Sequence, residues 1–307
     1  MTNKMKKTAL TSSLLLFLAA CIWGFAFVAQ SLGMNYMGPL IFNGTRFFLG
    51  GIVLLPVIFM RRRKSGKERN RTPFSFALKG GVCCGLALCA ASVFQQIGIK
   101  YTTVGKAGFI STLYIVIVPV LGLFLHKKVR GRIWIAAAVA VFGLYMLCVG
   151  ENLSLGRGDL FIFMCSILFS VHILLIDHFA PKMDGVILSC IQFFMAGAIC
   201  TVLGLILEQP VWSQLLAGIW PLLYAGVVSC GVAYTLQVIA QKNVEPSVAF
   251  LILSMESSVS LLGGWLILGQ ALSQKELFGC ALVFSAVILV QLPEKSPKES
   301  GIYKEAV

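Results

Sequence analysis

Two stretches of this chain, PLIFNGTRFFLGG at residues 39–51 and GVILSCIQFFMAG at residues 185–197, can be laid over one another at an offset of 146 residues. The alignment matches aromatic residues, glycines and one polar position: Phe47 with Phe193, Phe48 with Phe194, Gly51 with Gly197, and Arg46 with Gln192. The same offset lays residues 23–25 (Trp-Gly-Phe) over residues 169–171 (Phe-Ser-Val). The second half of the chain therefore repeats the first.

The composition is that of a membrane protein. Of the 307 residues, 58% are hydrophobic and 12% are charged, and the mean hydropathy is +0.89. Soluble domains carry about 25% charged residues, so a soluble globular domain is excluded. Residues 8–45, 80–99, 107–125, 133–150, 186–207 and 209–241 contain no charged residue and no histidine. Because a membrane span needs about 20 mostly apolar residues, the chain must cross a membrane several times.

The apolar pattern predicts ten transmembrane helices. We expect them at residues 8–29, 39–60, 75–98, 103–125, 133–149, 159–179, 186–207, 217–240, 247–268 and 275–292. They divide into a first five-helix repeat at 1–150 and a second at 151–292, followed by a cytoplasmic disordered tail at 293–307. Since five is odd, the second repeat lies upside down relative to the first, and inverted repeats place a solute site between them. The predicted fold is all-α integral membrane, with two inverted five-helix repeats around a central cavity.

The net charge of +13 raises the question of a nucleic-acid partner. The basic residues instead cluster in short segments on one side of the predicted spans, as at 61–71 and 127–132, while Lys100, Lys106, Arg157 and Lys275 fall on the other. By the positive-inside rule, this asymmetry predicts that both termini are cytoplasmic in a bacterial plasma membrane. We therefore expect a lipid bilayer and a small solute as partners, and no nucleic acid.

Signatures of catalysis and of metal binding are missing from the sequence. All ten cysteines fall within predicted spans and none forms a CxxC or Cys/His ligand spacing, so a metal site and a disulfide have little support. There is no HExxH motif and no pair of membrane aspartates. We expect no catalytic residue, no metal and no cofactor, although an intramembrane enzyme acting on a lipid-linked substrate remains an alternative.

Glu256 is the acidic residue that lies near the middle of a predicted span. It follows Ser247 by nine residues, which places it about 13 Å deep at 1.5 Å per residue. An ionisable group in hydrocarbon costs at least a few kcal/mol and needs an explanation. Glu256 is the candidate for proton coupling or cation binding; the alternative is a hydrogen-bonded carboxyl that ties helices together.

Two further ionisable residues are predicted inside the membrane. Arg46 lies about 10 Å from the start of its span and is a candidate for binding a carboxylate or phosphate of the solute, or for a structural role. His172 lies in the sixth span and is a candidate for the solute pathway, since a histidine can titrate near neutral pH; a helix-packing role is the alternative.

Amide and aromatic residues inside the predicted spans form a further, less specific pattern. The third predicted span ends with Gln95 and Gln96, and its counterpart, the eighth span, contains Tyr234, Thr235 and Gln237. Together with Trp23, Phe25 and Tyr114, such groups can line a cavity that hydrogen-bonds a polar solute and stacks on its apolar part.

At these residues the chain resembles the drug/metabolite transporter superfamily, specifically its ten-helix EamA-type members. The segments that carry the resemblance are CIWGFAFVAQ at 21–30, PLIFNGTRFFLGG at 39–51, KAGFISTLYIVIVPVLGLFLHKKV at 106–129, and residues 224–270. The last segment departs from the family pattern, which commonly reads Glu-Pro-Val and ends in Gly-Glu. This chain has Glu256-Ser257-Ser258 and ends in Gly269-Gln270, so family roles of that proline and that end carboxylate do not transfer.

The resemblance implies a transporter with a central cavity between two halves, moving amino acids, nucleobase-type metabolites or drugs, usually outward. The cavity residues it implies are Trp23, Phe25, Gln96, Tyr114, Tyr234, Gln237 and Glu256. We expect export of a small metabolite, an amino acid or similar amphipathic solute, by alternating access; a multidrug or nucleoside-type exporter is the alternative. Proton coupling, facilitated diffusion and exchange stay open, as do a monomer and a homodimer.

Overall fold

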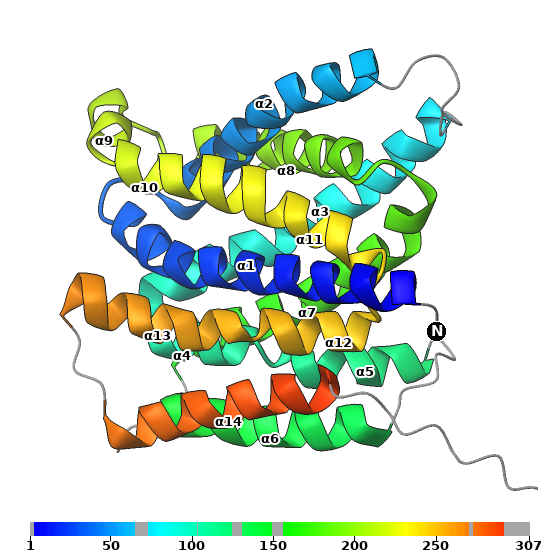
Figure 1. Cartoon of the computed structure of the whole chain (residues 1–307). Helices are drawn as coiled ribbons and strands as arrows, with labels where there is room; N and C mark the ends of the chain where they lie inside the picture. Colours follow the sequence, from blue (N-terminus) through cyan, green and yellow to red (C-terminus); the bar gives the residue numbers. More distant parts are fainter. Residues whose placement is uncertain are drawn as a thin grey trace, which may run out of the picture.

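The computed structural model describes residues 3–64, 73–102, 104–124, 131–148, 156–269 and 273–291, and these residues form helices and no β-strand. In chain order the helices are α1 (Asn3–Gly33), α2 (Pro39–Lys64), α3 (Phe74–Tyr101), α4 (Val104–Ser111), α5 (Tyr114–Phe124), α6 (Gly131–Cys148), α7 (Arg157–Phe179), the 3₁₀ turn η1 (Ala180–Lys182), α8 (Gly185–Leu207), α9 (Trp212–Ala217), α10 (Ile219–Leu223), the π-helix η2 (Tyr224–Tyr234), α11 (Thr235–Gln241), α12 (Pro246–Leu253), α13 (Met255–Leu268) and α14 (Gln274–Gln291). Most of them run along one common direction (Figure 1).

The helices are long and apolar enough for a membrane protein. Six segments meet the length and hydropathy of a span: Thr8–Gly33, Pro39–Arg61, Phe74–Tyr101, Arg157–Lys182, Gly185–Leu207 and Ile219–Gln241. Shorter apolar helices occupy Tyr114–Phe124, Gly131–Gly143, Leu251–Ile267 and Leu277–Ala286. The apolar helices of the described residues therefore fall on the ten predicted segments, while the short elements η1 and α9 lie between predicted spans. The fold is an all-helical membrane fold.

The fourth and ninth predicted spans, 103–125 and 247–268, differ from the expected continuous helices because each consists of two. The first break separates α4 from α5 at residues 112–113, where the hydroxyls of Ser111 and Thr112 both donate to the carbonyl of Gly108. The second separates α12 from α13 at Ser254, whose hydroxyl donates to the Leu251 carbonyl at 2.7 Å. Hydroxyl side chains that bond to the carbonyls of the preceding turn compete with regular helix geometry and often bend helices.

The two halves of the chain run in opposite directions through the molecule. We call the end where α1 begins and α14 ends "end A", and the opposite end "end B". In Figure 1, α2 runs from end B to end A, whereas α8 runs from end A to end B. The second repeat is thus inverted relative to the first, as the odd number of spans in each repeat requires.

The seam between α2 and α8 joins the two repeats through equivalent residues. Phe47 stacks on Phe193 with ring centroids 6.0 Å apart, and Phe48 and Phe194 also lie 6.0 Å apart. A Cβ atom added at Gly51 would meet the Phe194 ring at 3.0 Å, and one added at Gly197 would meet Phe48 at 3.3 Å. Residue i of one repeat contacts residue j of the other and the converse holds, which is the signature of a two-fold relation.

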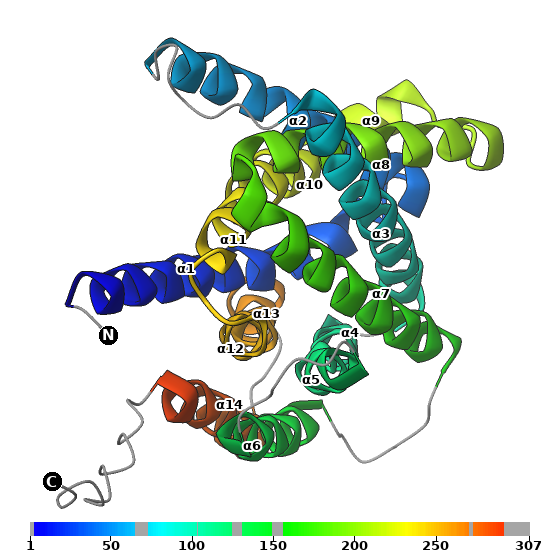
Figure 2. The same ribbon diagram turned by 90° about the vertical axis from the view of Figure 1, so that its right-hand side faces the viewer.

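The other helix pairs obey the same approximate two-fold relation. At the far side of the molecule α6 packs against α14, its counterpart, as the view onto end A shows (Figure 2). Between these two seams, α3 packs on α7, and the equivalent contact in the other repeat is that of α1 with η2 and α11. Likewise, α1 packs on α13, and the equivalent contact is that of α7 with α4 and α5. The helices α1 and α7 therefore lie at the centre, where each repeat faces the other.

Candidate functional site: a polar cavity between the two repeats

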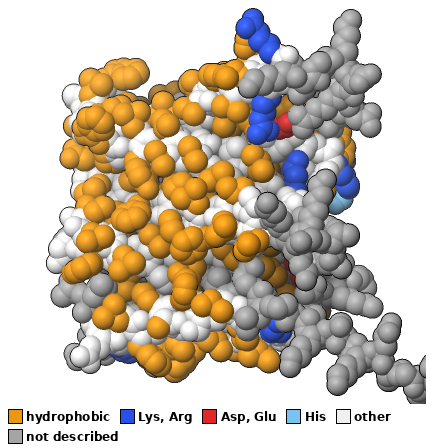
Figure 3. Space-filling view, in the orientation of Figure 1, with side chains coloured by type: hydrophobic (Ala, Val, Ile, Leu, Met, Phe, Trp, Pro, Cys, Tyr) orange, Lys and Arg blue, Asp and Glu red, His pale blue; other side chains and the backbone are white. Residues whose placement is uncertain are grey.

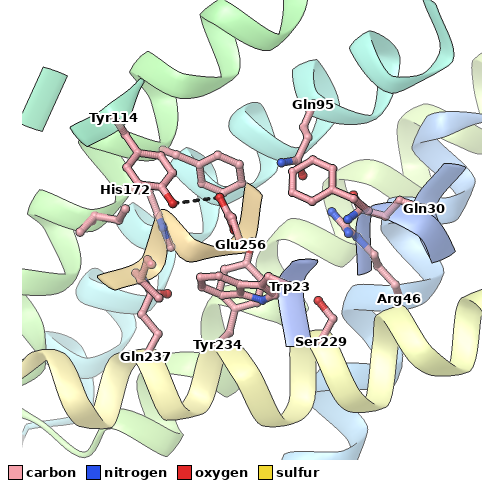
Figure 4. A pocket seen from close by; sticks show the side chains of 14 residues that line it. Trp23, Gln30, Arg46, Gln95, Tyr114, His172, Ser229, Tyr234, Gln237 and Glu256 are labelled. Carbon is pink, nitrogen blue, oxygen red and sulfur yellow. Dashed lines mark hydrogen bonds between the residues drawn. The ribbon is translucent and has the colours of Figure 1, made fainter. Parts of the chain in front are cut away.

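A cavity lies between the repeats at the level of the two broken helices, and its atom-free space, counted out to its open side, is about 520 Å³. The lining residues come from both repeats: Trp23, Phe27, Gln30, Arg46, Gln95, Tyr114, Phe169, His172, Ile173, Ser229, Tyr234, Gln237, Leu253 and Glu256 (Figure 4). The wall includes two repeat-related pairs, since Trp23 matches Phe169 and Phe27 matches Ile173 at the offset of 146.

Arg46 provides a buried positive charge on one side of the cavity. Its side chain is 2% exposed, and its guanidinium carbon lies 4.9 Å from the ring centre of Phe47 and 5.8 Å from that of Phe42. Its Nε and Nη2 have no hydrogen-bond partner among the described residues. The rings support the cation by cation–π attraction but accept none of its hydrogen bonds. Two N–H groups are therefore available to a ligand with paired oxygens, such as a carboxylate.

Glu256 provides a carboxyl group in the first turn of α13 and is 7% exposed. The Tyr114 hydroxyl donates a hydrogen bond of 2.9 Å to its Oε1, which joins the two broken helices across the cavity wall. The neighbouring serines do not contribute to this contact, because Ser254, Ser257 and Ser260 each donate to a carbonyl three residues earlier in the same helix. Oε2 of Glu256 is thereby left for a hydrogen-bond donor in the cavity.

The break before α13 brings Glu256 into contact distance of α1. A Cβ atom at Gly24 would lie 2.8 Å from the Glu256 backbone oxygen and 2.5 Å from Cβ of Val259. Only glycine allows this approach, since real Cβ atoms do not come so close to backbone. Gly24 therefore sets the distance between Trp23, the residue before it in α1, and Glu256.

His172 is fully buried on the side of the cavity opposite Arg46. Its Nε2 lies 3.0 Å from Oε1 of Gln192, while its Nδ1 has no hydrogen-bond partner in the described part of the chain. With the amide oriented in this way, Nε2–H donates to Gln192 and Nδ1 is an acceptor. Gln237, on the same side of the cavity, also has an unpaired Oε1, so two unpaired acceptors lie on this side.

Aromatic rings separate the two polar sides. Trp23 and Tyr234 meet edge to face with centroids 4.6 Å apart, and Tyr234 also contacts the rings of Phe193 and His172. Figure 4 shows Arg46, Gln30 and Ser229 on one side, Tyr114, His172 and Gln237 on the other, and Trp23 and Tyr234 between them. The cavity can accept an anionic group on one side and a hydrogen-bond-donating group on the other, with apolar surface in between.

Most residues predicted from the sequence lie together in this wall, namely Trp23, Arg46, Tyr114, His172, Tyr234, Gln237 and Glu256. Two do not. Phe25 points to α13, where a Cβ atom at Gly263 would lie 3.1 Å from its ring. Gln96 lies behind the wall and donates to the Gln30 carbonyl at 3.2 Å, while its neighbour Gln95 lines the cavity instead.

Several lining residues were not proposed from the sequence, among them Gln30, Ser229 and Phe169. The repeat contained the signal for Phe169, which matches Trp23 at the offset of 146. Gln30 follows Phe27 by three residues and Trp23 by seven, so helical spacing places it on the same face of α1. Ser229 has no comparable signal, because its orientation depends on the π-helix η2.

Comparison with known proteins divides the chain into the same two halves. The model of the EamA-like transporter family matches twice, at residues 10–149 and at residues 156–292. The chain belongs to the EamA-like transporter family. Membership supports a general role as a membrane transporter with a small-molecule solute.

Relatives of this family member cover most of its length. An uncharacterized transporter of Archaeoglobus fulgidus is 28% identical over 90% of this chain and 84% of its own. The uncharacterized inner membrane transporter YedA of Escherichia coli is 24% identical over 90% and 89%, and the uncharacterized transporter YoaV of Bacillus subtilis is 21% identical over 87% and 92%. These relatives and the apolar helices support a multi-pass protein of the plasma membrane.

A solved crystal structure shares the fold of this EamA-family chain. It matches with a TM-score of 0.73 at 19% sequence identity, covering 91% of this chain and 96% of the other. At this identity the likeness concerns the fold alone.

Proposed function

We propose that this chain exports a small amphipathic solute that carries both a carboxylate and an ammonium group, such as an amino acid, by alternating access. The observation that carries the proposal is Arg46, a buried guanidinium that lines the cavity and has two unpaired N–H groups. A charge inside a membrane protein marks a functional site unless a partner accounts for it. Among the described residues no ion pair involves Arg46, so a bound carboxylate is the partner that best accounts for it.

The opposite side of the cavity fits the ammonium group. Glu256 has a free carboxyl oxygen, and the unpaired acceptors of His172 and Gln237 lie on the same side. An ammonium group has three donors and no acceptor, which matches this set. Trp23 and Tyr234 would contact the apolar part of the solute from between the two polar groups.

We further propose that end A faces the cytoplasm. The described arginines and lysines near end A include Arg61, Arg63, Arg132, Lys182 and Lys242, and Figure 3 shows the visible basic side chains mostly toward that end. Hydrophobic side chains cover the middle of the same face. The excess of basic residues on one side supports cytoplasmic termini. In this proposal the repeats comprise residues 1–150 and 151–292, and the tail at 293–307 lies outside the described residues.

The test is a binding panel on the purified protein, read as thermal stabilisation and followed by counterflow into proteoliposomes. Ligands that bind only the folded state raise its stability with concentration. We expect an amino acid to stabilise the protein, and its methyl ester and its N-acetyl derivative each to lose most of the effect. Equal stabilisation by the ester would contradict the carboxylate role of Arg46.

A second candidate is export of a cationic drug or a nucleoside. It is favoured by Glu256, which lies beside the aromatic rings of Trp23 and Tyr234, a setting that suits an organic cation. In the same panel, stabilisation by cationic drugs or nucleosides without stabilisation by any amino acid would select this candidate.

A further inference from the structure

The cavity-facing cluster around Arg46 has a counterpart in the second repeat. Three polar positions of the first repeat match polar positions of the second at the offset of 146: Asn43 with Ser189, Arg46 with Gln192, and Gln95 with Gln241. All six side chains are buried, at 0–7% exposure. Because each buried polar group in a membrane protein is costly, six matched positions call for a common reason.

The counterpart cluster lies against His172. Gln192 contacts the histidine through Oε1, and Ser189 lies one turn earlier on the same face of α8. Gln241 donates at 3.2 Å to the carbonyl of Ile173, the residue after His172. The second cluster is therefore one layer behind the cavity wall, with His172 between it and the cavity.

The polar atoms of this cluster are not satisfied by one another. Nε2 of Gln192, Oγ of Ser189 and Oε1 of Gln241 have no hydrogen-bond partner within the described residues. Nearly all buried polar atoms in proteins have a partner, either protein or water. In particular, the Gln192 amide and the Ser189 hydroxyl are two donors on one helix face, which is what a carboxylate accepts.

The two clusters occupy equivalent depths from opposite ends of the molecule. Arg46 follows Pro39, the first residue of α2 at end B, by seven residues, and Gln192 follows Gly185, the first residue of α8 at end A, by seven. Each is about 10 Å from its own end at 1.5 Å per residue. The cavity thus has a polar cluster toward end B and a matching one toward end A.

We propose that Ser189 and Gln192, gated by His172, form a second site for the carboxylate group of the solute, used when the cavity opens toward end A. The proposal rests on the proposed function. In an inverted-repeat transporter each repeat adopts in turn the conformation of the other, so a half-site near one end has an equivalent near the other. Movement of the His172 ring out of the space between this cluster and the cavity exposes the donors of Gln192 and Ser189 to the solute.

The chemical difference between the two sites gives them different tasks. Arg46 is charged and holds the carboxylate tightly, whereas Gln192 and Ser189 are neutral donors and hold it weakly. A weak site toward one end lets the solute pass without being trapped. Substitution at the second site therefore slows transport but leaves equilibrium binding at Arg46 nearly unchanged.

The first experiment compares binding and flux in Gln192→Leu and Ser189→Ala. Loss of one neutral hydrogen bond in transit corresponds to about tenfold in rate. We expect counterflow to fall about tenfold in Gln192→Leu with the Kd of the amino acid changed less than about threefold. Ser166→Ala is the matched control, because Ser166 is an equally buried serine whose hydroxyl is satisfied by the Phe163 carbonyl of its own helix.

The second experiment keeps the proposal testable if Gln192→Leu fails to fold. Gln192→Cys is treated with a membrane-impermeant thiol reagent from each side separately, with the wild-type protein giving the background of its own cysteines. We expect labelling from the side that end A faces and protection by the amino acid. No labelling from that side, or wild-type flux in Gln192→Leu, overturns the second site.

The two proposals fail in different ways. If wild-type protein shows no binding and no counterflow of any amino acid, the proposed function fails before the second site is tested. If wild-type binding and counterflow are normal but the Gln192 and Ser189 variants behave like Ser166→Ala, only the second site is contradicted.

Discussion

The α2–α8 seam and the cavity lie side by side, but they differ in how far their residues follow the two-fold relation between the repeats. At the seam the residues are the same in both halves: Phe47 meets Phe193, and Gly51 and Gly197 make room for the facing rings. In the cavity the two-fold relation is broken, because Arg46 matches Gln192 and Glu256 matches Ile110 at the same offset. Packing at the seam needs only complementary shapes, and in a two-fold arrangement each complementary contact occurs twice, once from each repeat.

Recognition of a solute requires more than this symmetry. A small molecule with distinct ends has no two-fold axis, so a symmetric cavity would bind it in two orientations with equal affinity. One guanidinium and one carboxyl group at non-equivalent positions remove that degeneracy. The comparison predicts that substitutions at the seam act equally in the two halves, whereas substitutions in the cavity act unequally.

The largest expected effect is that of Arg46→Gln. It removes the charge that we assign to carboxylate binding, and charge-assisted hydrogen bonds contribute about 1.5–3 kcal/mol each, so losing two of them should lower the affinity by at least about 100-fold. Equilibrium binding of the amino acid measures this. Arg61→Gln is the control, since Arg61 is half exposed at end A and pairs with Asp184 at 3.9 Å. An unchanged Kd in Arg46→Gln would assign Arg46 to structure.

Glu256→Gln tests the other non-equivalent position. We expect it to abolish any acceleration of transport by a pH gradient while leaving the folded protein intact, because the amide keeps the shape of the carboxyl group but does not gain or lose a proton near neutral pH. Counterflow with and without the gradient measures the effect. Tyr114→Phe, which removes the hydrogen bond to Oε1, should change the pH dependence but not eliminate it. Wild-type coupling in Glu256→Gln would make Glu256 a helix-joining residue.

At the α2–α8 seam, equivalent substitutions in the two repeats should have equal effects on stability. Gly51→Leu and Gly197→Leu should each destabilise the protein by about 1–3 kcal/mol, because each side chain meets a phenylalanine ring of the other repeat. Thermal unfolding in detergent measures both. Gly131→Leu is the control, since a Cβ atom there has nothing within 4 Å. A large difference between the two seam variants would count against the two-fold relation.

The smallest effect is expected at the aromatic pair Trp23 and Phe169, which occupy equivalent positions in the wall. Trp23 also packs edge to face on Tyr234, and such contacts contribute about 0.5–1.5 kcal/mol beyond area. Trp23→Leu should therefore weaken amino-acid binding by about fivefold, and Phe169→Leu by less, as measured by the same binding assay. Equal effects would mean that the solute contacts both rings alike.

Much of the architecture follows from local sequence rules. Apolar length predicts spans because the bilayer has a fixed thickness, and this rule located the helices. The offset of 146 identified the two repeats and the residues that meet at the α2–α8 seam. The buried positions of Arg46, His172 and Glu256 follow from the rarity of ionisable residues in spans.

The details of the cavity wall were harder to predict. The sequence favoured Gln96, but the side chain in the wall is that of Gln95, since a step of one residue turns a helix by about 100°. Hydropathy also gave no sign of the breaks at Thr112 and Ser254, which depend on hydroxyl groups bonding within their own helices. Ser257 and Ser260 near Glu256 donate to carbonyls of their own helix and do not contact the carboxylate.

By itself the sequence determined the family, the spans and the inverted repeat, because each depends on composition or spacing along one dimension. The tertiary structure decided which face of each helix meets the cavity, how Tyr114 reaches Glu256, and that Gln192 contacts His172. These contacts join residues 20 to 142 positions apart in the chain. Residues so far apart in the chain meet only when helix packing brings them together, and no local sequence pattern predicts these contacts.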